Sequence, residues 1–285
     1  MISATHHHII ATLNTLLGAR KGIVRQCDAG CGSGALLALI ATDFRSLRPD
    51  IELELYGFDV SDSGVQADGF FDKAIDLLSE SDRNVDWHDR LRLITSKDRW
   101  PFADGFLDVV VSNQVLEHVT DHVFFMSEHH RALCEGGMGI HLYPSQEILW
   151  EGHVHLPIAH RFRQYSLRRS YIRVAGYVFP KPYLAHRAAF GISRDVHAEE
   201  HADYLGFWTN YTSTTTMLDT CKRARLRADF GFTIDYFWAA LRRKLGLKPI
   251  LKYKTPRAIR ALALPFLRAL GDVTLHVEKR QTYFR

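Results

Sequence analysis

The sequence has few cysteines, no long apolar run and only a small excess of positive charge. Its four cysteines (Cys27, Cys31, Cys134 and Cys221) are too few for a disulfide framework in 285 residues, which favours a reducing compartment. No stretch approaches the roughly 20 apolar residues of a membrane span, and the N-terminus lacks the order of a signal peptide. We therefore predict a globular protein in the cytoplasm.

The net charge by itself excludes few classes of protein. The net charge is +4, with 46% hydrophobic and 24% charged residues, which is the composition of an ordinary globular chain. The basic runs "RRK" and "KYK" are short and no RNA-binding module accompanies them. We predict no nucleic-acid partner.

The segment "CDAGCGSG" (27–34) places three glycines at alternate positions behind an aspartate. An apolar run with β-branched residues (22–28) precedes it, leucines and isoleucine at helical spacing (34–47) follow, and an alternating segment (51–59) comes next. The pattern predicts a strand, a glycine turn, a helix and a second strand that ends at Asp59. Glycines let a ligand approach the main chain, and the free N–H groups of the helix start face the same place.

This turn has more than one interpretation. Residues 30–35 formally satisfy G-x-G-x-x-G/A, the dinucleotide fingerprint, with Asp59 as the acid that binds ribose. A tight turn with a packing glycine is the simpler alternative. The fingerprint alone would fit an NAD(P)-dependent Rossmann oxidoreductase.

Four further segments extend the pattern. Residues 90–97 and 107–113 predict strands, and "VLEHV" (115–119) predicts the opening of a helix. Residues 122–145 predict an amphipathic helix, a Gly-Gly turn and a strand. At this point the chain resembles class I S-adenosylmethionine-dependent methyltransferases, the type 11-like group that includes quinone-biosynthesis C-methyltransferases. The blocks "DAGCGSG", "GFD", "WPFADGFLDVVVSNQVLEHV" and "ALCEGGMGIHLYPS" follow the family's order over residues 15–145.

The resemblance implies an α/β fold: a Rossmann-like, mostly parallel sheet of seven strands, the last antiparallel, with helices on both faces. It implies S-adenosylmethionine as cofactor and S-adenosylhomocysteine as product. Asp28 and the glycine main chain would hold the methionine portion, and Asp59 would bind both ribose hydroxyls. The implied donor-site residues are Asp28, Gly30, Gly32, Gly34, Asp59, Val60, Lys97, Asp98, Asn113 and Gln114.

Two assignments stay open within this set. Val60, with Phe58, would line the adenine or belong to the core. Where the family carries an aspartate ahead of its "LPF"-like block, this chain has Ser96. The adenine amino contact would then fall to Asp98 or to the main chain at Lys97.

Methyl transfer needs positioning, and a base only where a hydroxyl must lose its proton. His118 is a candidate base, with a structural or donor-loop role as the alternative, and Glu117 is interpreted as a helix N-terminal acid. His153 and His155 alternate on a segment predicted to be extended, near His160. They would contact the acceptor, act as a base, bind a metal or be plain loop residues. We take His118 and His153 as the catalytic candidates and predict no metal site.

The chain divides into residues 1–145 as the donor-binding core, 146–211 as a helical cover on the acceptor side, and 212–285 as the completion of the core. The cover is dense in His, Arg, Tyr and Trp, with five arginines between 161 and 173. It loosely resembles methyltransferases of polysaccharide or glycolipid pathways. The arginines would bind a phosphate or sugar, or form a solvated helix face.

Residues 236–271 contain no acidic residue, and positive charges alternate there with Leu, Ile, Phe and Trp. Such a basic amphipathic insertion suits an anionic membrane surface. A pair of packed helices with a solvated basic face, interrupted by Pro249, Pro256 and Pro265, is the other interpretation. Peripheral contact with the inner membrane face is therefore one prediction for this segment.

These patterns favour methyl transfer from S-adenosylmethionine to a small-molecule or lipid-linked acceptor, first of all a sugar hydroxyl. An NAD(P)-dependent Rossmann oxidoreductase and a non-catalytic, membrane-associated protein that binds S-adenosylmethionine are the alternatives. The sequence does not name the acceptor, the methylated atom or the oligomeric state.

Overall fold

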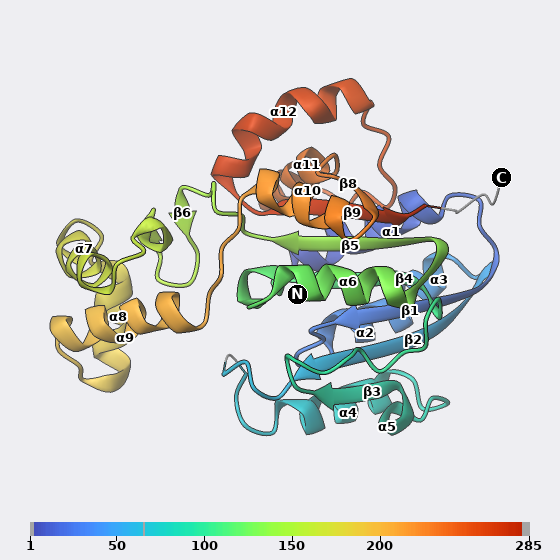
Figure 1. Cartoon of the computed structure of the whole chain (residues 1–285), viewed down its shortest axis with the longest axis horizontal. Helices are drawn as coiled ribbons and strands as arrows, with labels where there is room; N and C mark the ends of the chain where they lie inside the picture. The colour runs from blue at the N-terminus through green and yellow to red at the C-terminus, as the bar shows by residue number, and fades with distance from the viewer. Residues whose placement is uncertain (1–2, 65, 281–285) are drawn as a thin grey trace.

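A seven-stranded sheet forms the centre of the computed structural model, which describes residues 3–64 and 66–280 (Figure 1). Its order is β3-β2-β1-β4-β5-β9-β8. Neighbours from β3 to β5 pair in parallel, and β9 is antiparallel to both β5 and β8. The bounds are β1 (Gly22–Ala29), β2 (Ile51–Val60), β3 (Leu91–Ile94), β4 (Leu107–Asn113), β5 (Leu133–Tyr143), β8 (Leu226–Asp229) and β9 (Val273–Lys279). The predicted Rossmann-like sheet with its antiparallel last strand is confirmed.

Helices cover both faces of this sheet because successive residues of each strand point to opposite sides. In β4, Val109 and Val111 join one apolar cluster, and Leu107 and Val110 join the other. The first cluster includes α1 (Ala4–Leu17), α2 (Ala35–Leu39) with its π-helical continuation Ile40–Phe44, and α4 (Phe70–Ser81). The second includes α6 (His122–Ala132) and α10 (Thr214–Arg223). The short helices α3 (Arg45–Leu47) and α5 (Trp87–Arg90) flank β2, and α11 (Thr233–Lys244) packs on α1.

The strand order reverses at β1. The chain runs from β1 to β2 and β3 on one side, then crosses to β4 and β5 on the other. In open α/β sheets, ligands bind at such a switch point, outside the carboxyl ends of the strands. Asp28 lies there, paired in register with Gly57 of β2 and Val111 of β4.

Two local predictions were wrong. The segment "VLEHV" forms a single 3-10 turn, Leu116–His118, and α6 begins only at His122, where the Asp121 side chain accepts a hydrogen bond from the Phe124 N–H at 2.9 Å. The Gly-Gly pair lies inside β5, where the pairing jumps from Leu133 to Met138 along the strand, so the glycines form a bulge instead of a turn. Of the segment 273–281 predicted as the closing strand, residue 281 lies outside the described residues.

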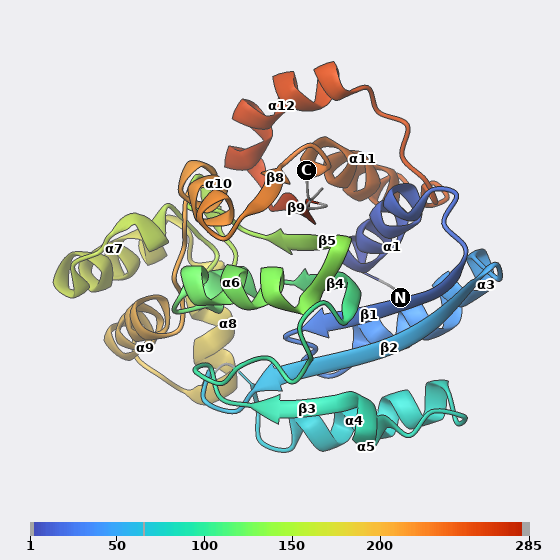
Figure 2. The ribbon, with the colours of Figure 1, turned by 45° about the vertical axis from the view of Figure 1, so that its right-hand side comes forward.

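Residues 146–211 build a separate layer beyond the strand ends. They contain the pair β6 (Trp150–Glu151) and β7 (Leu156–Pro157), a 3-10 turn at Ala159–Arg161, and the helices α7 (Tyr165–Val178), α8 (Lys181–Phe190) and α9 (Arg194–Phe207). Their apolar side chains form a cluster of their own, which includes Val154, Ile172, Ala198 and Leu205. In both views the three helices gather at the end of the sheet to which β5 points (Figures 1 and 2). We call this layer the cover.

The basic segment forms most of α11, a connecting loop and α12 (Arg257–Leu270). Figure 2 shows α12 as an outer layer beside α11, over the β8 edge of the sheet. Its C-terminal end reaches the start of the cover, where the Leu149 N–H donates to the Ala269 carbonyl at 2.8 Å. Among the described helices, none combines the length and apolar character needed to cross a membrane.

Candidate active site

A cavity of about 890 Å³ opens at the carboxyl ends of β1, β2 and β4. This volume lies in the range of small-molecule and cofactor sites. Most donor-site residues predicted from the sequence line it, together with one catalytic candidate: Asp28, Gly30, Gly32, Asp59, Val60, Lys97, Asp98, Asn113, Gln114 and His118. Gly34 and His153 do not.

The first and the last glycine of the turn are required for different reasons. Gly30 has φ +77°, and a Cβ there would lie 2.6 Å from the Val115 side chain, so the residue must be glycine. Gly34 has φ +76°, and a Cβ there would approach Leu78 of α4 to 3.1 Å. The first glycine therefore lets the 115–119 segment close over the cavity, and the last lets two helices pack.

Asp28 is a buried carboxylate without an internal counter-charge. It is 2% exposed, and its Oδ1 has no hydrogen-bond partner among the described residues. Burial, and secondly the neighbouring Asp59, raises its pKa well above the usual value. An unsatisfied buried carboxylate is costly. A cationic ligand in the cavity would remove that cost.

Asp59 is tied to the backbone on both sides of the cavity. Its Oδ2 accepts a hydrogen bond from the Gly32 N–H at 2.6 Å, and its Oδ1 accepts one from the Val60 N–H at 2.7 Å. Burial raises its pKa, although these two N–H groups act in the opposite direction. A carboxylate offers about four acceptor positions, so both oxygens can still accept ligand hydroxyls.

The rim near β3 contains an acid that the sequence analysis missed. Asp62 accepts hydrogen bonds from the Ser96 N–H and Oγ, both at 2.8 Å, and lines the cavity. It thus places a carboxylate beside the position where the family's own aspartate is absent. Asp98 accepts from the Thr95 N–H at 2.8 Å, and this bond lowers the pKa of Asp98. The only sequence signal for Asp62 was its nearness to Asp59.

Asn113 and Gln114 lie at the end of β4 and differ in whether their side chains are already hydrogen-bonded. The Asn113 Oδ1 is buried without a hydrogen-bond partner among the described residues. Gln114 has φ +58°, and its Nε2 donates to Asp272 Oδ2 at 2.9 Å. Asn113 therefore keeps an acceptor for a ligand, whereas the Gln114 amide is already engaged.

The cover closes one side of the cavity through the end of α9. Phe207 and Trp208 line the cavity, and the Trp208 ring lies where a Cβ on Gly64 would be only 2.2 Å away. His118 Nδ1 hydrogen-bonds the Trp208 carbonyl at 2.6 Å. His118 therefore joins the cover to the loop after β4, which the sequence analysis kept as the alternative to a base.

Behind His118 lies His153, held by a carboxylate. The two rings are 5.2 Å apart, edge to face. His153 Nδ1 lies 2.7 Å from Glu151 Oε1, which also accepts from the Tyr211 hydroxyl at 2.5 Å. Burial opposes ionisation of Glu151, but the hydrogen bonds from His153, Tyr211 and the Val154 N–H lower its pKa to about 2. Glu151 is therefore an ionised, fully buried partner of His153.

Glu117 is not the helix N-terminal acid that the sequence predicted. It is 1% exposed, and neither carboxylate oxygen has a hydrogen-bond partner among the described residues. Burial raises its pKa well above the usual value, and burial likewise lowers the pKa of His118. Glu117, His118 and His153 each bring one possible ligand atom within 4.8 Å of the others.

The other two histidines of this segment lie apart. Residues 152–155 form a turn between β6 and β7, and His155 is exposed there with φ +53°. The predicted extended segment with His153 and His155 on one face is therefore wrong. His160 Nε2 hydrogen-bonds the Gln146 carbonyl at 3.1 Å.

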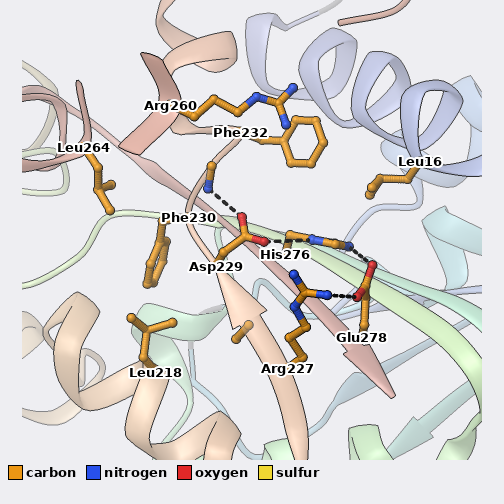
Figure 3. A pocket seen from close by; sticks show the side chains of 12 residues that line it. Leu16, Leu218, Arg227, Asp229, Phe230, Phe232, Arg260, Leu264, His276 and Glu278 are labelled. Atoms are coloured by element: carbon orange, nitrogen blue, oxygen red, sulfur yellow. Dashed lines mark hydrogen bonds and ion pairs between the residues drawn. The ribbon is translucent and has the colours of Figure 1, made fainter. Parts of the chain in front are cut away.

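A second cavity of about 520 Å³ lies below α12 and is lined by charged groups that have ion-pair partners (Figure 3). Asp229 pairs with His276 at 3.4 Å, and Glu278 pairs with Arg227 at 3.7 Å. The cavity at the strand ends differs because Asp28 has no such partner. The unpaired Asp28 therefore makes the cavity at the strand ends, and not the cavity below α12, suited to a cationic ligand.

Residues 27–140 match the family model described as a methyltransferase domain. No curated protein sequence matches the chain. Among solved structures, geranyl diphosphate C-methyltransferase from Streptomyces coelicolor A3(2) is 15% identical over 96% of this chain and 74% of its own, with a TM-score of 0.47. YcgJ from Bacillus subtilis is 12% identical over 97% of this chain and 100% of its own, with a TM-score of 0.48.

Phosphoethanolamine N-methyltransferase 2 from Haemonchus contortus is also similar, at 12% identity and a TM-score of 0.46. The match covers 97% of this chain and 52% of that protein, so this chain spans about half of its length.

Proposed function

We propose that this chain, an S-adenosylmethionine-dependent methyltransferase by its methyltransferase domain at residues 27–140, methylates a hydroxyl of a small-molecule or lipid-linked acceptor. The choice of a hydroxyl as acceptor rests on the pair of Glu151 and His153, with 2.7 Å between Oε1 and Nδ1. Methylation of a hydroxyl needs a base, and a histidine oriented by a buried carboxylate is suited to that task.

The donor side supplies charge and position. When bound, S-adenosylmethionine carries an activated methyl group on a sulfonium, so the protein has mainly to orient it. Asp28 would face the ammonium group, because its buried carboxylate has an unpartnered oxygen at the cavity wall. Asp59 would accept the ribose hydroxyls while its backbone contacts hold the glycine turn. The Asn113 Oδ1 is available to the methionine portion.

On the acceptor side, His153 would take the proton from a hydroxyl that lies between its ring and the donor cavity, because His153 itself does not line the cavity. Its Nδ1–H donates to Glu151, which leaves the Nε2 lone pair free to accept a proton from the attacking hydroxyl. The bound donor would supply the methyl group to that oxygen, and His153 would hold the proton that the oxygen releases. His118 would position this side by holding Trp208 against the cavity. The aromatic faces of Phe207 and Trp208 at the cavity suit a sugar ring.

The same residues disfavour a nicotinamide dinucleotide. A pyrophosphate on the glycine turn would lie near Asp28, and its negative charge would oppose the ionisation of this buried carboxyl still further. Calorimetric titration with S-adenosylhomocysteine and, separately, with NAD⁺ tests this. We expect micromolar affinity for the first and no binding of the second. Binding of NAD⁺ with no binding of S-adenosylhomocysteine would overturn the donor assignment.

The acceptor is then found with labelled S-adenosylmethionine. Label transfer is measured to sugar nucleotides, to lipid-linked glycans and to amine or carbon acceptors of similar size. We expect transfer to a hydroxyl, with product that resists alkaline hydrolysis as an ether does. Transfer only to nitrogen or carbon would refute the role of His153 as a hydroxyl base.

A lipid-linked acceptor is supported by the outer face of α12. Ile259, Leu262, Phe266 and Leu270 follow one another at helical spacing, and all are exposed, Phe266 by 74%. Exposed cations precede α12 at the end of α11 and in the loop that follows it: Arg243, Lys244, Lys248, Lys252 and Lys254. An apolar row with flanking cations fits the interface of an anionic membrane. The end of α12 touches the cover, so a bound membrane would lie near the acceptor side.

Phe266→Asp tests this contact against a matched change elsewhere. Phe190, at the end of α8, is 73% exposed and lies outside the basic segment. We expect Phe266→Asp to weaken binding to phosphatidylglycerol vesicles and Phe190→Asp to leave it unchanged. Equal binding of the wild type and both variants would refute membrane contact through α12.

A further inference from the structure

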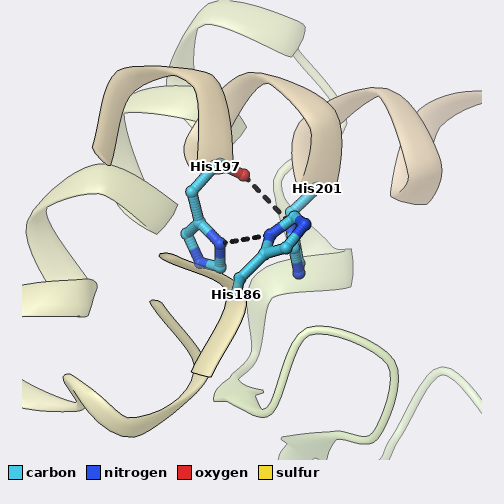
Figure 4. A group of neighbouring side chains, drawn as sticks. All are labelled: His186, His197 and His201. Atoms are coloured by element: carbon cyan, nitrogen blue, oxygen red, sulfur yellow. Dashed lines mark hydrogen bonds between the residues drawn. The ribbon is translucent and has the colours of Figure 1, made fainter. Parts of the chain in front are cut away.

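Three histidines of the cover meet between two helices. His186 comes from α8, and His197 and His201 come from successive turns of α9 (Figure 4). His186 Nδ1 and His197 Nδ1 are 3.0 Å apart, and one ring nitrogen of each histidine lies within 4.8 Å of the others. His197 is buried, while His186 and His201 are partly exposed. The cluster is therefore reachable from solvent and anchored in the cover.

The remaining ring nitrogens of two of these histidines face oxygens. His201 Nδ1 lies 2.9 Å from the His197 carbonyl, and His186 Nε2 lies 3.5 Å from Glu200 Oε2. Metal-binding histidines characteristically donate their second N–H to a carbonyl or carboxylate, which fixes the ring and its tautomer. In this arrangement His186 Nδ1 and His201 Nε2 carry lone pairs.

The facing nitrogens of His186 and His197 are poorly matched to each other. His186 Nδ1 and His197 Nδ1 face each other, so at most one of them can be a donor in that contact. Burial, and then the neighbouring His201 and His186, lowers the pKa of His197 to about 4.

We propose that His186, His197 and His201 bind one zinc ion, with the fourth position open to water. In a tetrahedral site with Zn–N of about 2.0–2.1 Å, two nitrogens stand about 3.3–3.4 Å apart, close to the separation seen between His186 and His197. A set of three imidazole nitrogens favours zinc over magnesium or calcium, which prefer oxygen ligands.

The ion would fasten α8 to the cover. Tyr183 is the one buried side chain of this helix among the described residues, so α8 contributes little to the apolar cluster of the cover. It packs mainly on α9, the helix whose end carries Phe207 and Trp208 to the donor cavity. Zinc would join α8 and α9 directly and stiffen the wall of the active site.

Zinc binding to the metal-free full-length protein, measured by calorimetry, tests the site. We expect one tight zinc per chain and, with Co²⁺ as probe, the visible absorption of a tetrahedral site. His186→Gln should lower zinc affinity at least about a hundredfold, and Glu200→Gln, which removes only the outer carboxylate, by about 10–100-fold. The partly exposed His186 on a lightly packed helix can be replaced without unfolding the chain.

His153→Gln is the matched control because it removes one histidine from the group of Glu117, His118 and His153. We expect this variant to bind zinc as tightly as the wild type. Zinc should raise the unfolding temperature of the wild type and of His153→Gln but not of His186→Gln. Zinc affinity that survives in His186→Gln, or a wild type that binds no zinc, would overturn the proposal, and neither outcome bears on methyl transfer.

Discussion

Under the proposed function, the donor side and the acceptor side of the active site are built in different ways. The donor side consists of one strand-turn-helix unit, whose glycines expose main chain, and two carboxylates at the ends of adjacent parallel strands. The acceptor side combines side chains from three separate segments, represented by His118, His153 and Tyr211. A site made by backbone geometry is local in sequence, whereas a site made by side chains depends on how distant segments pack.

Their electrostatics differ as well. Asp28 has no counter-charge within the protein, so the donor would balance its charge. Glu151 already has hydrogen bonds from His153, Tyr211 and a backbone N–H. On this proposal the donor side would be completed by its ligand, whereas the hydrogen bonds of the acceptor side are already in place.

The strongest test of this division is His153→Gln. Loss of a general base reduces turnover by about 100- to 10,000-fold, while the donor cavity, which His153 does not line, is left intact. We expect kcat to fall by this factor and the affinity for S-adenosylhomocysteine to stay unchanged. A loss of donor affinity, or a kcat within a few-fold of the wild type, would show that the two sides are not separate in this way.

A second test uses the acidity of Glu151. Its folded pKa of about 2 lies below its ordinary value of 4.5, so its ionised form stabilises the fold. This stabilisation is complete above pH 4.5 and is lost as the pH falls through the range down to about 2. It amounts to roughly 3 kcal/mol, because each pKa unit corresponds to about 1.4 kcal/mol.

The measurement is the free energy of urea unfolding between pH 6 and pH 3, for the wild type and Glu151→Gln. Because the two proteins share all other carboxyl groups, the difference between their free energies of unfolding reports on Glu151. We expect the wild type to lose its advantage over the variant as the pH falls. A difference that stays constant with pH would mean that Glu151 is not held ionised by its partners.

The same contrast explains what the sequence could predict. Single strands and the glycine turn follow from local patterns, such as the apolar strand 107–113 and the motif "CDAGCGSG". The seven-stranded sheet with its antiparallel last strand was implied by the resemblance to a family. His118 and His153 could be chosen as candidates by residue type, but nothing in their spacing says that their rings lie 5.2 Å apart. Trp208 reaches His118 only after the chain has passed through the three helices of the cover. No periodicity in the sequence predicts where that passage ends.

The histidine cluster of the cover was missed for a related reason. His197 and His201 are four residues apart on one helix, which is a readable signal. The third member, His186, lies on another helix, and its approach depends on the turn at Gly191, where φ is +69°. Glu117 was misinterpreted because the helix predicted after it is only a 3-10 turn.

The smallest expected effect concerns the donor side alone. Asp59→Ala removes a charged acceptor from both ribose hydroxyls and should weaken S-adenosylhomocysteine binding by about 1–3 kcal/mol. Methylthioadenosine shares the ribose but lacks the amino acid, so its affinity should fall by the same factor. Asp28→Asn should weaken S-adenosylhomocysteine and leave methylthioadenosine unchanged, because Asp28 would contact only the ammonium group. If Asp59→Ala leaves both affinities intact, ribose binding belongs to another residue, and Asp62 becomes the first candidate because its carboxylate also lines the cavity.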